Sequence, residues 1–553
     1  MSQLEKLRKS TCLSDLATIL GYKPKSVSFI IYKIPEDKKY IEFEIPKKNG
    51  KTRKINAPVD QLKHLQRRLA DLLNNCFNEI SSEAQKKSLS HGFRKNNSII
   101  TNANNHKNKR YVFNVDLKDF FPSINFGRVR GFLIKNNDFS LNEKVATVIA
   151  QIACHNNELP QGSPCSPTIS NLIAYLLDIR MVNLAKHSKC NYSRYADDLT
   201  FSTNRKDFPN LIAIKKDDKS WDASKKLIPE IEKVGFCINP DKTSMQFRTS
   251  RQVTTGLIVN EKVNIKSEYY KKARSMCHAV FNTGQFYIEG DDTEKENTIK
   301  QLEGILSFIY YAKRPHEPSK DGSRKYNPTA ITTLYRKFLF YKHFYSLEKP
   351  LILCEGKTDI IYLKCALKQL SNTYSDFVDT SKDKITYKVS FLNFSKNLRD
   401  VFSISTGTSG LDFIIDNYKK LSPTFKAPRK PYPVVVIVDN DDGSKEIKKK
   451  LKINNGDAIT DFYHFSDNLY ILIAPKNKTG AIEDFFDDNI LSTKIGGKSF
   501  NREKKIDPNS EYGKMVFAEK VVAANQKSIS FDKFKEVFDG MRKIVRDCDD
   551  KIV

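Results

Sequence analysis

Two adjacent aspartates, Asp197 and Asp198, stand between an aromatic residue and an apolar run in the segment SRYADDLTFS, residues 193–202. The segment has the pattern of a hairpin tip, where aspartate is a common turn residue. Two carboxylates at such a tip can also hold a divalent cation if a third carboxylate comes from elsewhere in the fold. The choice between a plain turn and a metal site therefore depends on a third carboxylate.

A third carboxylate is available upstream, in the segment YVFNVDLKDFFPSI, residues 111–124. Residues 111–115 form a predicted buried strand with Asp116 at its end. A strand-end aspartate opposite a two-aspartate hairpin can bind two metal ions, one to activate an attacking hydroxyl group and one to stabilise the leaving oxygen. Asp116, Asp197 and Asp198 are therefore the predicted catalytic residues of a phosphoryl or nucleotidyl transfer reaction.

A second set of carboxylates follows apolar strands in the C-terminal part of the chain. Glu355 comes directly after the predicted strand LILC and before a predicted helix. Asp439 and Asp441 end the buried strand of PVVVIVDNDDGS, and residues two apart in a strand point to the same side. Because open α/β sheets bind ligands at the carboxyl ends of their strands, we expect these three carboxylates to face one another. A further acidic segment, IEDFFDD, begins near residue 482.

The elements that would carry these residues change in character along the chain. Residues 1–110 combine helical periodicity with a basic hairpin, YIEFEIPKKNGKTRKINAP, that turns at an Asn-Gly pair. Residues 261–345 are predicted to be helical and strongly basic. From Lys349 onward strands alternate with helices, which predicts a parallel α/β sheet. We therefore expect a domain boundary near residue 347.

The composition is that of a folded chain with several domains. The chain has 553 residues and is 39% hydrophobic, which is enough for sizeable cores. Its formal net charge of +28 favours a polyanionic partner, most often nucleic acid, although a merely basic surface gives the same charge. No apolar run is long enough to span a membrane, and no signal peptide is predicted. The ten cysteines include no Cys-x-x-Cys pair, which favours a reducing cytosol over a disulfide framework or a zinc site.

Three segments, in their order and spacing, resemble successive palm motifs of reverse transcriptases: FNVDLKDFF, LPQGSPCSP and YADD. The resemblance implies a right-hand polymerase with fingers in residues 1–110, a palm in 111–255 and a thumb in 256–346. It also implies a set of residues at the incoming nucleotide. These are Lys47, Lys48 and Arg53 in the fingers, the steric gate Phe121, Gln161, and Lys242 in the segment GFCINPDKT, which looks like the next palm motif.

Two further segments resemble elements of retron reverse transcriptases. NANNH, residues 102–106, matches the NAxxH signature, and TTG, residues 254–256, stands where that family has Val-Thr-Gly. Retron enzymes recognise their own structured non-coding RNA, prime from a guanosine 2′-OH in it, and copy part of it into a branched RNA–DNA molecule. The residues that the resemblance implies in RNA recognition are Asn102, Ala103, His106, Thr255 and Gly256. A structural role in a loop would equally explain His106, and we do not predict it to be catalytic.

The C-terminal carboxylates, a glutamate followed by Asp-x-Asp, resemble the TOPRIM domain of topoisomerases, primases and overcoming-lysogenization-defect nucleases over residues 348–500. In that family these residues hold Mg²⁺ for phosphodiester chemistry. Glu483 resembles the extra acidic ligand of the nuclease branch, and Lys514 in GKMVFAEKVV resembles its basic catalytic residue. A degenerate domain that binds without cutting is the alternative.

The resemblances together imply a multidomain α+β and α/β chain, a right-hand polymerase followed by a TOPRIM domain in residues 347–553. The expected function is that of a retron RNA-directed DNA polymerase in the bacterial cytoplasm, with a fused TOPRIM effector in antiphage defence. It would use Mg²⁺ at both sites, dNTPs, its own non-coding RNA and the RNA-linked multicopy single-stranded DNA product. Two other functions stay open: a mobile-element reverse transcriptase whose TOPRIM domain processes its product, and a catalytically idle RNA-binding scaffold. No membrane partner is expected, and association between copies of the chain is left open.

Overall fold

The chain folds into two compact units, Met1–Lys266 and Ser267–Val553. The computed structural model describes residues 1–46, 50, 52–83, 89–217, 220–288, 298–316, 327–381, 385–404, 408–430, 432–454, 457–503 and 505–551. The boundary expected near residue 347 lies inside the second unit. The basic helices after residue 267 therefore belong to the same compact unit as the C-terminal residues.

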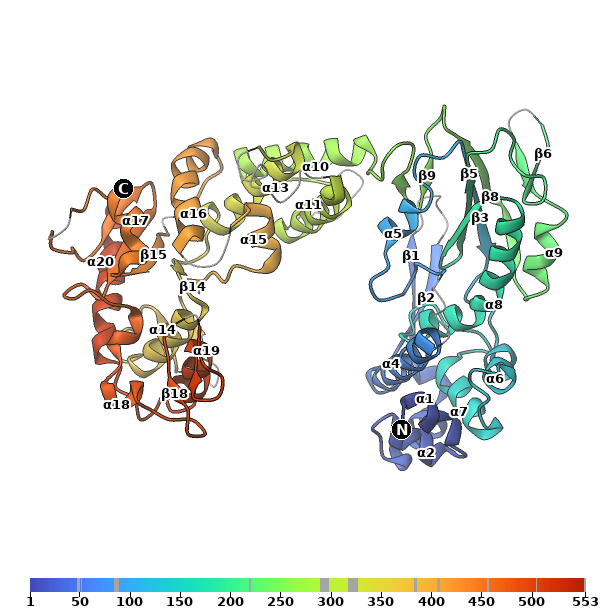
Figure 1. Ribbon diagram of the computed structural model, residues 1–553, viewed down its shortest axis with the longest axis horizontal. Helices are drawn as coiled ribbons and strands as arrows, with labels where there is room; N and C mark the ends of the chain where they lie inside the picture. The colour runs from blue at the N-terminus through green and yellow to red at the C-terminus, as the bar shows by residue number, and fades with distance from the viewer. Residues whose placement is uncertain are drawn as a thin grey trace. The chain divides into compact units, whose positions relative to one another are not determined.

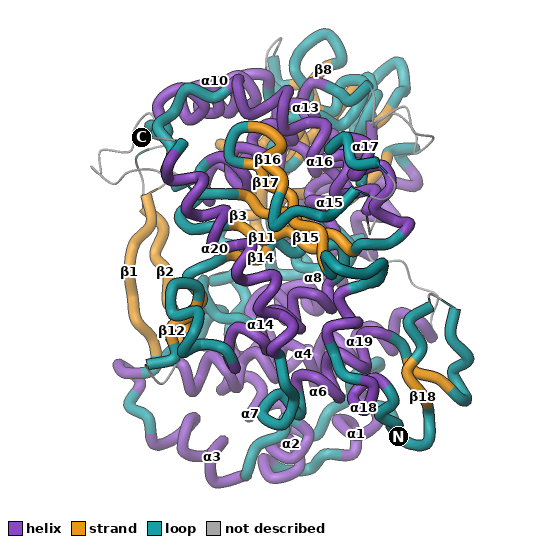
Figure 2. Tube along the Cα trace, turned by 90° about the vertical axis from the view of Figure 1, so that its left-hand side faces the viewer, coloured by secondary structure: helices purple, strands orange, loops and turns teal. Residues whose placement is uncertain are grey.

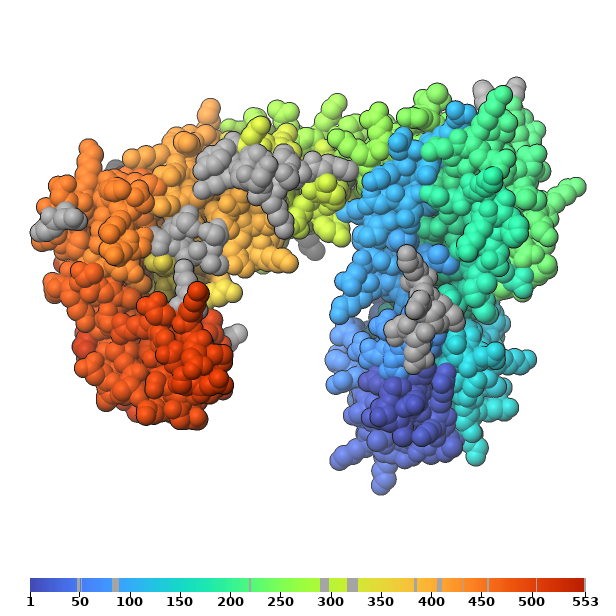
Figure 3. All heavy atoms as spheres, in the orientation of Figure 1, coloured from blue at the N-terminus to red at the C-terminus, as the bar shows by residue number. Residues whose placement is uncertain are grey.

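Helices and one hairpin build the first part of the first unit. The hairpin pairs β1 (Tyr40–Pro46) with β2 (Thr52–Pro58), as the sequence predicted. The N-terminal helices pack on the segment near residue 138, where the Arg8 guanidinium donates to the Asp138 carbonyl at 3.1 Å; Figure 3 shows this dark-blue segment against the cyan one. The helices are α1 (Gln3–Lys9), α2 (Leu13–Ile19), α3 (Pro24–Ser28), Phe29–Lys33, Glu36–Lys38, α4 (Asp60–Glu83) and α5 (Ile99–Asn104).

A four-stranded antiparallel sheet forms the centre of the first unit, in the order β4-β5-β3-β8. The inward side chains of its strands, such as Phe113 and Phe201, are fully buried and pack in one core with the long helix α8 (Ser166–His187), which runs along the sheet in Figure 1. The strands are β3 (Tyr111–Lys118), β4 (Asn191–Tyr195), β5 (Asp198–Thr203) and β8 (Cys237–Phe247). Around them lie α6 (Phe126–Lys135), α7 (Glu143–Ala153), β6 (Ala213–Lys215), β7 (Trp221–Ala223), α9 (Leu227–Glu232), β9 (Val253–Thr254) and β10 (Leu257–Ile258).

The second unit begins with helices that share an aromatic core with later residues. The Phe281 ring lies 5.2 Å from the Phe425 ring, and the Phe281 carbonyl accepts a hydrogen bond from the Lys426 N–H at 2.8 Å. The Tyr345 hydroxyl donates to the Ala427 carbonyl at 2.7 Å. These contacts join the helices to the C-terminal sheet region. The helices are α10 (Ser267–Thr283), α11 (Ile299–Lys313), Arg314–His316, α13 (Ala330–Phe340) and Tyr341–Tyr345.

A five-stranded sheet in the order β14-β11-β15-β17-β16 is the centre of the second unit (Figure 2). Four strands are parallel, which confirms the predicted parallel sheet, and β16 adds an antiparallel edge. The helix α20 (Lys535–Asp550) packs so closely on β17 that a Cβ at Gly540 would lie 2.7 Å from Leu472 Cδ1. The strands are β11 (Leu351–Cys354), β14 (Ser390–Phe391), β15 (Val434–Asp439), β16 (Tyr463–Ser466) and β17 (Leu469–Ala474).

Helices and short strand pairs surround this sheet. Within the described residues, no helix is both long enough and apolar enough to cross a lipid bilayer. The helices are α14 (Lys357–Gln369), α15 (Lys396–Phe402), α16 (Thr408–Leu421), Ser422–Thr424, Asp442–Ser444, α17 (Lys445–Lys450), Ile482–Phe485, α18 (Asp488–Leu491), α19 (Lys514–Val516), Phe517–Ala523 and Asp532–Phe534. The short strands are β12 (Val378–Asp379), β13 (Thr386–Tyr387), β18 (Ser499–Phe500) and β19 (Glu511–Tyr512).

Candidate functional site

The three predicted palm carboxylates come together where β3 meets β5. Asp116 and Asp198 are direct partners in the antiparallel pairing of these strands, which places their side chains next to each other. Asp197 lies in the turn before β5, and its carbonyl accepts a hydrogen bond from the Leu117 N–H at 3.0 Å. Burial, followed by the charges of Asp197 and Asp116, raises the pKa of Asp198 to about 7. The structure therefore brings together the residues that the sequence predicted.

A lysine from β8 supplies positive charge at this cluster. The Nζ atom of Lys242 lies 2.8 Å from Oδ1 of Asp116, and Asn239 Nδ2 donates to the other carboxylate oxygen at 3.3 Å. The hydrogen bond with Asp116 raises the pKa of Lys242. The Lys242 ammonium therefore stands in for a cation at these carboxylates, at a position that the sequence analysis assigned to the triphosphate of a nucleotide.

Magnesium suits the chemistry of this donor set. Asp116, Asp197 and Asp198 offer carboxylate oxygens, which are the ligands that Mg²⁺ prefers. Burial and the charge of Asp116 also raise the pKa of Asp197, so a divalent cation would relieve the crowding of negative charge. In the part of the chain that the structure describes, no three His, Cys, Asp or Glu side chains are already arranged around a metal position.

The loop that carries Gln161 lies directly on the hairpin of β1 and β2. The Gln161 carbonyl accepts a hydrogen bond from the Asn56 N–H at 2.7 Å. A Cβ at Gly162 would lie 2.6 Å from the Asn56 carbonyl oxygen, and the φ of Gly162 is +124°, so glycine is required here. On the same strand as Asn56, Arg53 lies near enough to Asp197 for its charge to lower the pKa of that carboxyl. The contact explains how the loop and the hairpin are held together.

The remaining residues assigned to the nucleotide are only partly placed by the structure. Phe121 is half-buried, with its ring 5.4 Å from the Phe120 ring and 6.3 Å from the Phe93 ring. Its role as a steric gate stays a prediction. Lys47 and Lys48 lie outside the described residues.

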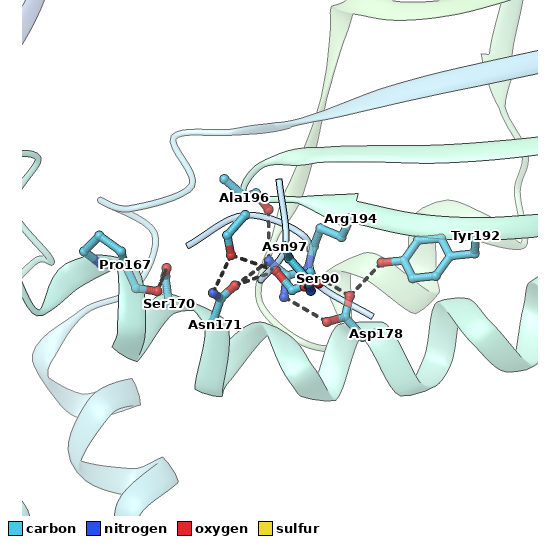
Figure 4. A network of polar contacts seen from close by, with 10 residues as sticks. Ser90, Asn97, Pro167, Ser170, Asn171, Asp178, Tyr192, Arg194 and Ala196 are labelled. Carbon is cyan, nitrogen blue, oxygen red and sulfur yellow. Dashed lines mark hydrogen bonds and ion pairs between the residues drawn. The ribbon is translucent and has the colours of Figure 1, made fainter. Parts of the chain in front are cut away.

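A buried ion pair that the sequence analysis did not identify lies beneath the aspartate turn (Figure 4). Arg194 of β4 and Asp178 of α8 are 0% and 1% exposed and share two hydrogen bonds of 2.8 Å. The Tyr192 hydroxyl also donates to Asp178 at 2.8 Å. A further Arg194 N–H donates to the carbonyl of Ala196 at 3.1 Å, and Ala196 has a φ of +55°. Arg194 therefore supports the strained residue that precedes Asp197.

The same network joins the turn to the segment around residue 90. The Asn171 side chain on α8 accepts from Arg194 at 3.2 Å and from the Ser90 hydroxyl at 2.9 Å, and it donates to the Gly92 carbonyl at 2.9 Å (Figure 4). A Cβ at Gly92 would lie 2.7 Å from the backbone nitrogen of Ala196. Sequence spacing gives no sign of these contacts, because their partners lie 23 to 104 positions apart. The one sequence signal is an arginine directly before the YADD segment.

The NAxxH residues brace the aspartate hairpin from another side. The side chains of Asn102, Ala103 and His106 are fully buried. The Ser193 hydroxyl donates to Asn102 Oδ1 at 2.6 Å and lies 2.7 Å from His106 Nε2, while His106 Nδ1 lies 2.7 Å from the Ser202 hydroxyl. Because the Ser193 proton goes to Asn102, Nε2 is the donor and Nδ1 accepts from Ser202. In this structure the three residues cannot contact RNA directly, so any part in RNA recognition is indirect.

The TTG turn docks on the same helix that carries the NAxxH residues. The Thr255 hydroxyl donates to the Ile99 carbonyl of α5 at 3.3 Å. Thr255 and Gly256 have φ values of +47° and +81°, and a Cβ at Gly256 would meet open space. The two retron-like elements are thus joined in one structure beside β4 and β5. Their predicted role in RNA recognition stays a prediction.

The second acidic site lies at the carboxyl edge of the five-stranded sheet. Glu355 follows β11 and Asp439 ends the neighbouring parallel strand β15. Burial, followed by the charges of Asp359, Glu483 and Glu355, raises the pKa of Asp439 to about 8. Glu483 is fully buried and forms an ion pair of 3.0 Å with Lys514. The structure brings four of the five predicted residues of this site together.

Two further carboxylates, those of Asp441 and Asp359, lie near this edge of the sheet. Asp441 has an extended backbone, with φ −123° and ψ −171°, and accepts a hydrogen bond from the Gly443 N–H at 2.9 Å; its approach to Glu355 stays a prediction. Asp359 was not predicted. It is 8% exposed, accepts from the Gly356 N–H at 2.8 Å, and has a pKa raised by burial. From sequence, Gly356 followed by Asp359 is typical of a capped helix start, which hides its proximity to Asp439.

Removing Arg194 should destabilise the fold because it would leave Asp178 buried without its partner. We expect Arg194→Met to cost about 3–5 kcal/mol, and Arg194→Met/Asp178→Leu to recover much of that loss. Thermal unfolding of the full chain measures both. The matched control is Arg180→Met on α8, the helix that carries Asp178; its pair with Glu230 lies at the surface, with an exposed arginine and a half-buried glutamate, and its loss should change the melting temperature much less. An Arg194→Met protein as stable as the wild type would contradict the role given to this pair.

Lowering the pH should destabilise the wild type more than a variant that lacks the His106 imidazole. Burial lowers the pKa of His106 to about 3, whereas an unfolded histidine titrates near 6.5. Between these values only the unfolded chain binds the proton, so stability falls as the pH falls below about 6.5. From pH 7 to pH 5 the wild type should lose about 2 kcal/mol more than His106→Gln. Melting temperatures at the two pH values test this, with His187→Gln on the exposed end of α8 as the control that keeps the wild-type response.

Comparisons with known proteins agree with this architecture. Residues 45–271 match the family model of reverse transcriptase (RNA-dependent DNA polymerase). The retron Ec86 reverse transcriptase of Escherichia coli is 33% identical over 300 residues, which cover 54% of this chain and 83% of that one. The retron Mx65 reverse transcriptase of Myxococcus xanthus is 32% identical over 49% of this chain and 60% of its own length. A solved structure of apo telomerase from Candida tropicalis aligns with 42% of this chain and 56% of the telomerase chain, at 15% identity. Its TM-score of 0.29 is too low to define the fold. With its palm carboxylates in place and a relative of this identity and coverage, the chain belongs to the retron reverse transcriptase family of RNA-directed DNA polymerases.

Proposed function

We propose that the protein copies its own non-coding RNA into RNA-linked single-stranded DNA, and that its C-terminal unit is a TOPRIM-like, Mg²⁺-dependent phosphodiesterase. The observation that carries the polymerase assignment is the convergence of Asp116, Asp197 and Asp198 at β3 and β5 with Lys242 as their counter-charge. In this proposal the RNA–DNA product restrains the C-terminal unit, and phage infection releases it. The whole system works in the bacterial cytoplasm, with which ten free cysteines are compatible.

The side chains of the palm have distinct tasks in the polymerase reaction. Asp116, Asp197 and Asp198 would hold magnesium, which supplies positive charge to the attacking and leaving oxygens of the phosphoryl transfer. With magnesium at these carboxylates, Lys242 would no longer be needed as their counter-charge and would be free to contact the triphosphate of a dNTP. Arg53 adds a second positive charge from the hairpin. Catalysis of this kind rests on positioning and charge neutralisation, which is why the supported turn matters.

The C-terminal assignment rests on carboxylates at the edge of a parallel sheet. Glu355 and Asp439 end neighbouring strands, and burial, followed by the charges of Asp359, Glu483 and Glu355, raises the pKa of Asp439. Oxygen donors of this type suit Mg²⁺, and phosphodiester hydrolysis is the chemistry that such a site supports. The Lys514 ammonium, held by Glu483, would stabilise negative charge on the phosphate. The product would be a broken nucleic acid strand.

Replacing one palm carboxylate should abolish DNA synthesis. The wild type, expressed with its flanking non-coding locus, should yield a discrete DNA band on a denaturing gel that shifts after RNase and after debranching treatment. Asp197→Asn should lose that band because its amide is a poor metal ligand. Asp207→Asn, an exposed aspartate of the same unit, is the matched control and should keep it. A band that persists in Asp197→Asn would remove this residue from the catalytic site, and DNA without linked RNA would remove the retron reaction.

Replacing Glu355 should silence the C-terminal unit and leave the polymerase intact. Expression of the chain without its non-coding RNA should be toxic to the host, and Glu355→Gln should relieve that toxicity. Glu348→Gln, an exposed glutamate just before β11, is the matched control and should remain toxic. Toxicity that survives Glu355→Gln would show that the second site is assigned wrongly. If the wild type is harmless but Glu355→Gln changes the ends of the DNA product, the C-terminal unit is a processing enzyme.

A further inference from the structure

The second unit contains a cavity of about 520 Å³ that has no role in the functions proposed above. We call it the lysine cavity. Its wall is formed by α17 and by the loop that follows β17. Five lysines line it against a single carboxylate, that of Asp457; they are Lys445, Lys448, Lys449, Lys476 and Lys478. Such an excess of positive charge favours an anion over a cation.

The lysine cavity shares a wall with the second acidic site. Asn440, which lines the cavity, stands between Asp439 and Asp441 at the end of β15. Its amide nitrogen donates to the carbonyls of Pro475 at 2.9 Å and Lys478 at 3.1 Å. Successive side chains of an extended segment point to opposite sides, so Asn440 faces the cavity where Asp439 faces the carboxylates. The cavity is therefore lined by the residue that stands between two of the carboxylates proposed to hold metal.

The lysines are positioned by contacts that a polyanion can replace. Lys445, Lys448 and Lys449 occupy positions i, i+3 and i+4 of α17, which places them on one face of the helix. Lys448 is held by the neutral amide of Asn440 at 2.7 Å. Lys445 and Lys449 pair with Asp442 and Glu446 in contacts of 3.0 and 2.7 Å between exposed side chains, and pairs of that kind contribute little. Lys476 is held more firmly, by an ion pair with the half-buried Asp461, so the ammonium groups on α17 are the ones that a polyanion can most readily recruit.

The number and spread of these charges favour a chain of phosphates over one small anion. We propose that the lysine cavity binds the phosphodiester backbone of a single nucleic acid strand and guides that strand to Asp439 and Glu355. Grooves that track such backbones use positive charge in this way, without reading bases. This inference rests on the proposed phosphodiesterase function of the second unit, and it specifies the substrate as a polynucleotide.

The first experiment measures occupancy of the cavity without requiring cleavage. The full chain, expressed without its non-coding RNA and kept in EDTA, is acetylated on its lysines in the presence of oligo-dT, oligo-U or dTMP at equal phosphate concentration. Mass spectrometry should show that acetylation of Lys449 and Lys478 falls several-fold with an oligonucleotide and stays unchanged with dTMP. Protection by both oligonucleotides means that the backbone alone is bound, and protection by one identifies the sugar that is required. Lys520 and Lys527, exposed lysines that do not line the cavity, are the internal controls.

The second experiment tests whether the cavity serves the reaction. Lys449→Glu/Lys478→Glu should reduce strand cleavage about tenfold or more near physiological salt. A plot of the logarithm of the strand-binding constant against the logarithm of salt concentration should become shallower by about 1.4, because two phosphate contacts with a single strand are lost. Lys449→Arg/Lys478→Arg should restore both, and Lys520→Glu/Lys527→Glu, with the same change of charge, should behave as the wild type.

The outcomes separate this inference from the function on which it rests. Absence of protection, or equal protection by dTMP, overturns the lysine cavity as a strand-binding site. Cleavage by Lys449→Glu/Lys478→Glu at the wild-type rate overturns it too and leaves the phosphodiesterase proposal standing. Protection of the two lysines in a chain that never cleaves supports the cavity and refutes the phosphodiesterase instead.

Discussion

The ion pair between Arg194 and Asp178 is the interaction on which the geometry of the polymerase site depends. A guanidinium and a carboxylate removed from water are costly to bury, and the cost is offset only when the remaining donors find partners. Here the spare N–H groups of Arg194 reach the Ala196 carbonyl and the Asn171 amide. The requirement to satisfy a buried arginine therefore fixes the backbone one residue before Asp197. The position of a catalytic carboxylate follows from the solvation of a residue that never meets the substrate.

The opposite support of the same hairpin comes from the retron-like elements. His106 bridges the hydroxyls of Ser193 and Ser202 on β4 and β5, and the TTG turn rests on the helix that precedes it. The hairpin is thus held between α8 and α5, by an ion pair on one side and by a neutral imidazole on the other. This arrangement makes the segment that distinguishes retron enzymes part of the frame of the active site. A change in that segment would reach Asp197 through two hydroxyl groups.

Sequence reasoning succeeded where chemistry and strand order are local. The meeting of Asp116, Asp197 and Asp198, the hairpin of β1 and β2, and the parallel order that brings Glu355 to Asp439 all follow from patterns within short segments. It missed Arg194, Asp178 and Asp359, because a buried charge is recognised only by a partner that tertiary folding supplies. For Asp441 the prediction stays open: its backbone is extended, as alternation along the strand requires, and its carboxylate accepts a hydrogen bond from the Gly443 N–H.

The aromatic core around Phe281 and Phe425 also bears on how this chain can be divided. The helices α10 and α13 share an aromatic core with Phe425, which lies between α16 and β15, so a cut near residue 347 would divide one interior. A fragment that stops near residue 347 would carry the exposed rings of Phe281 and Tyr341 into solvent and tend to aggregate. A fragment that ends at Lys266 would instead keep the first compact unit whole. For modular engineering, the natural unit of exchange begins at Ser267.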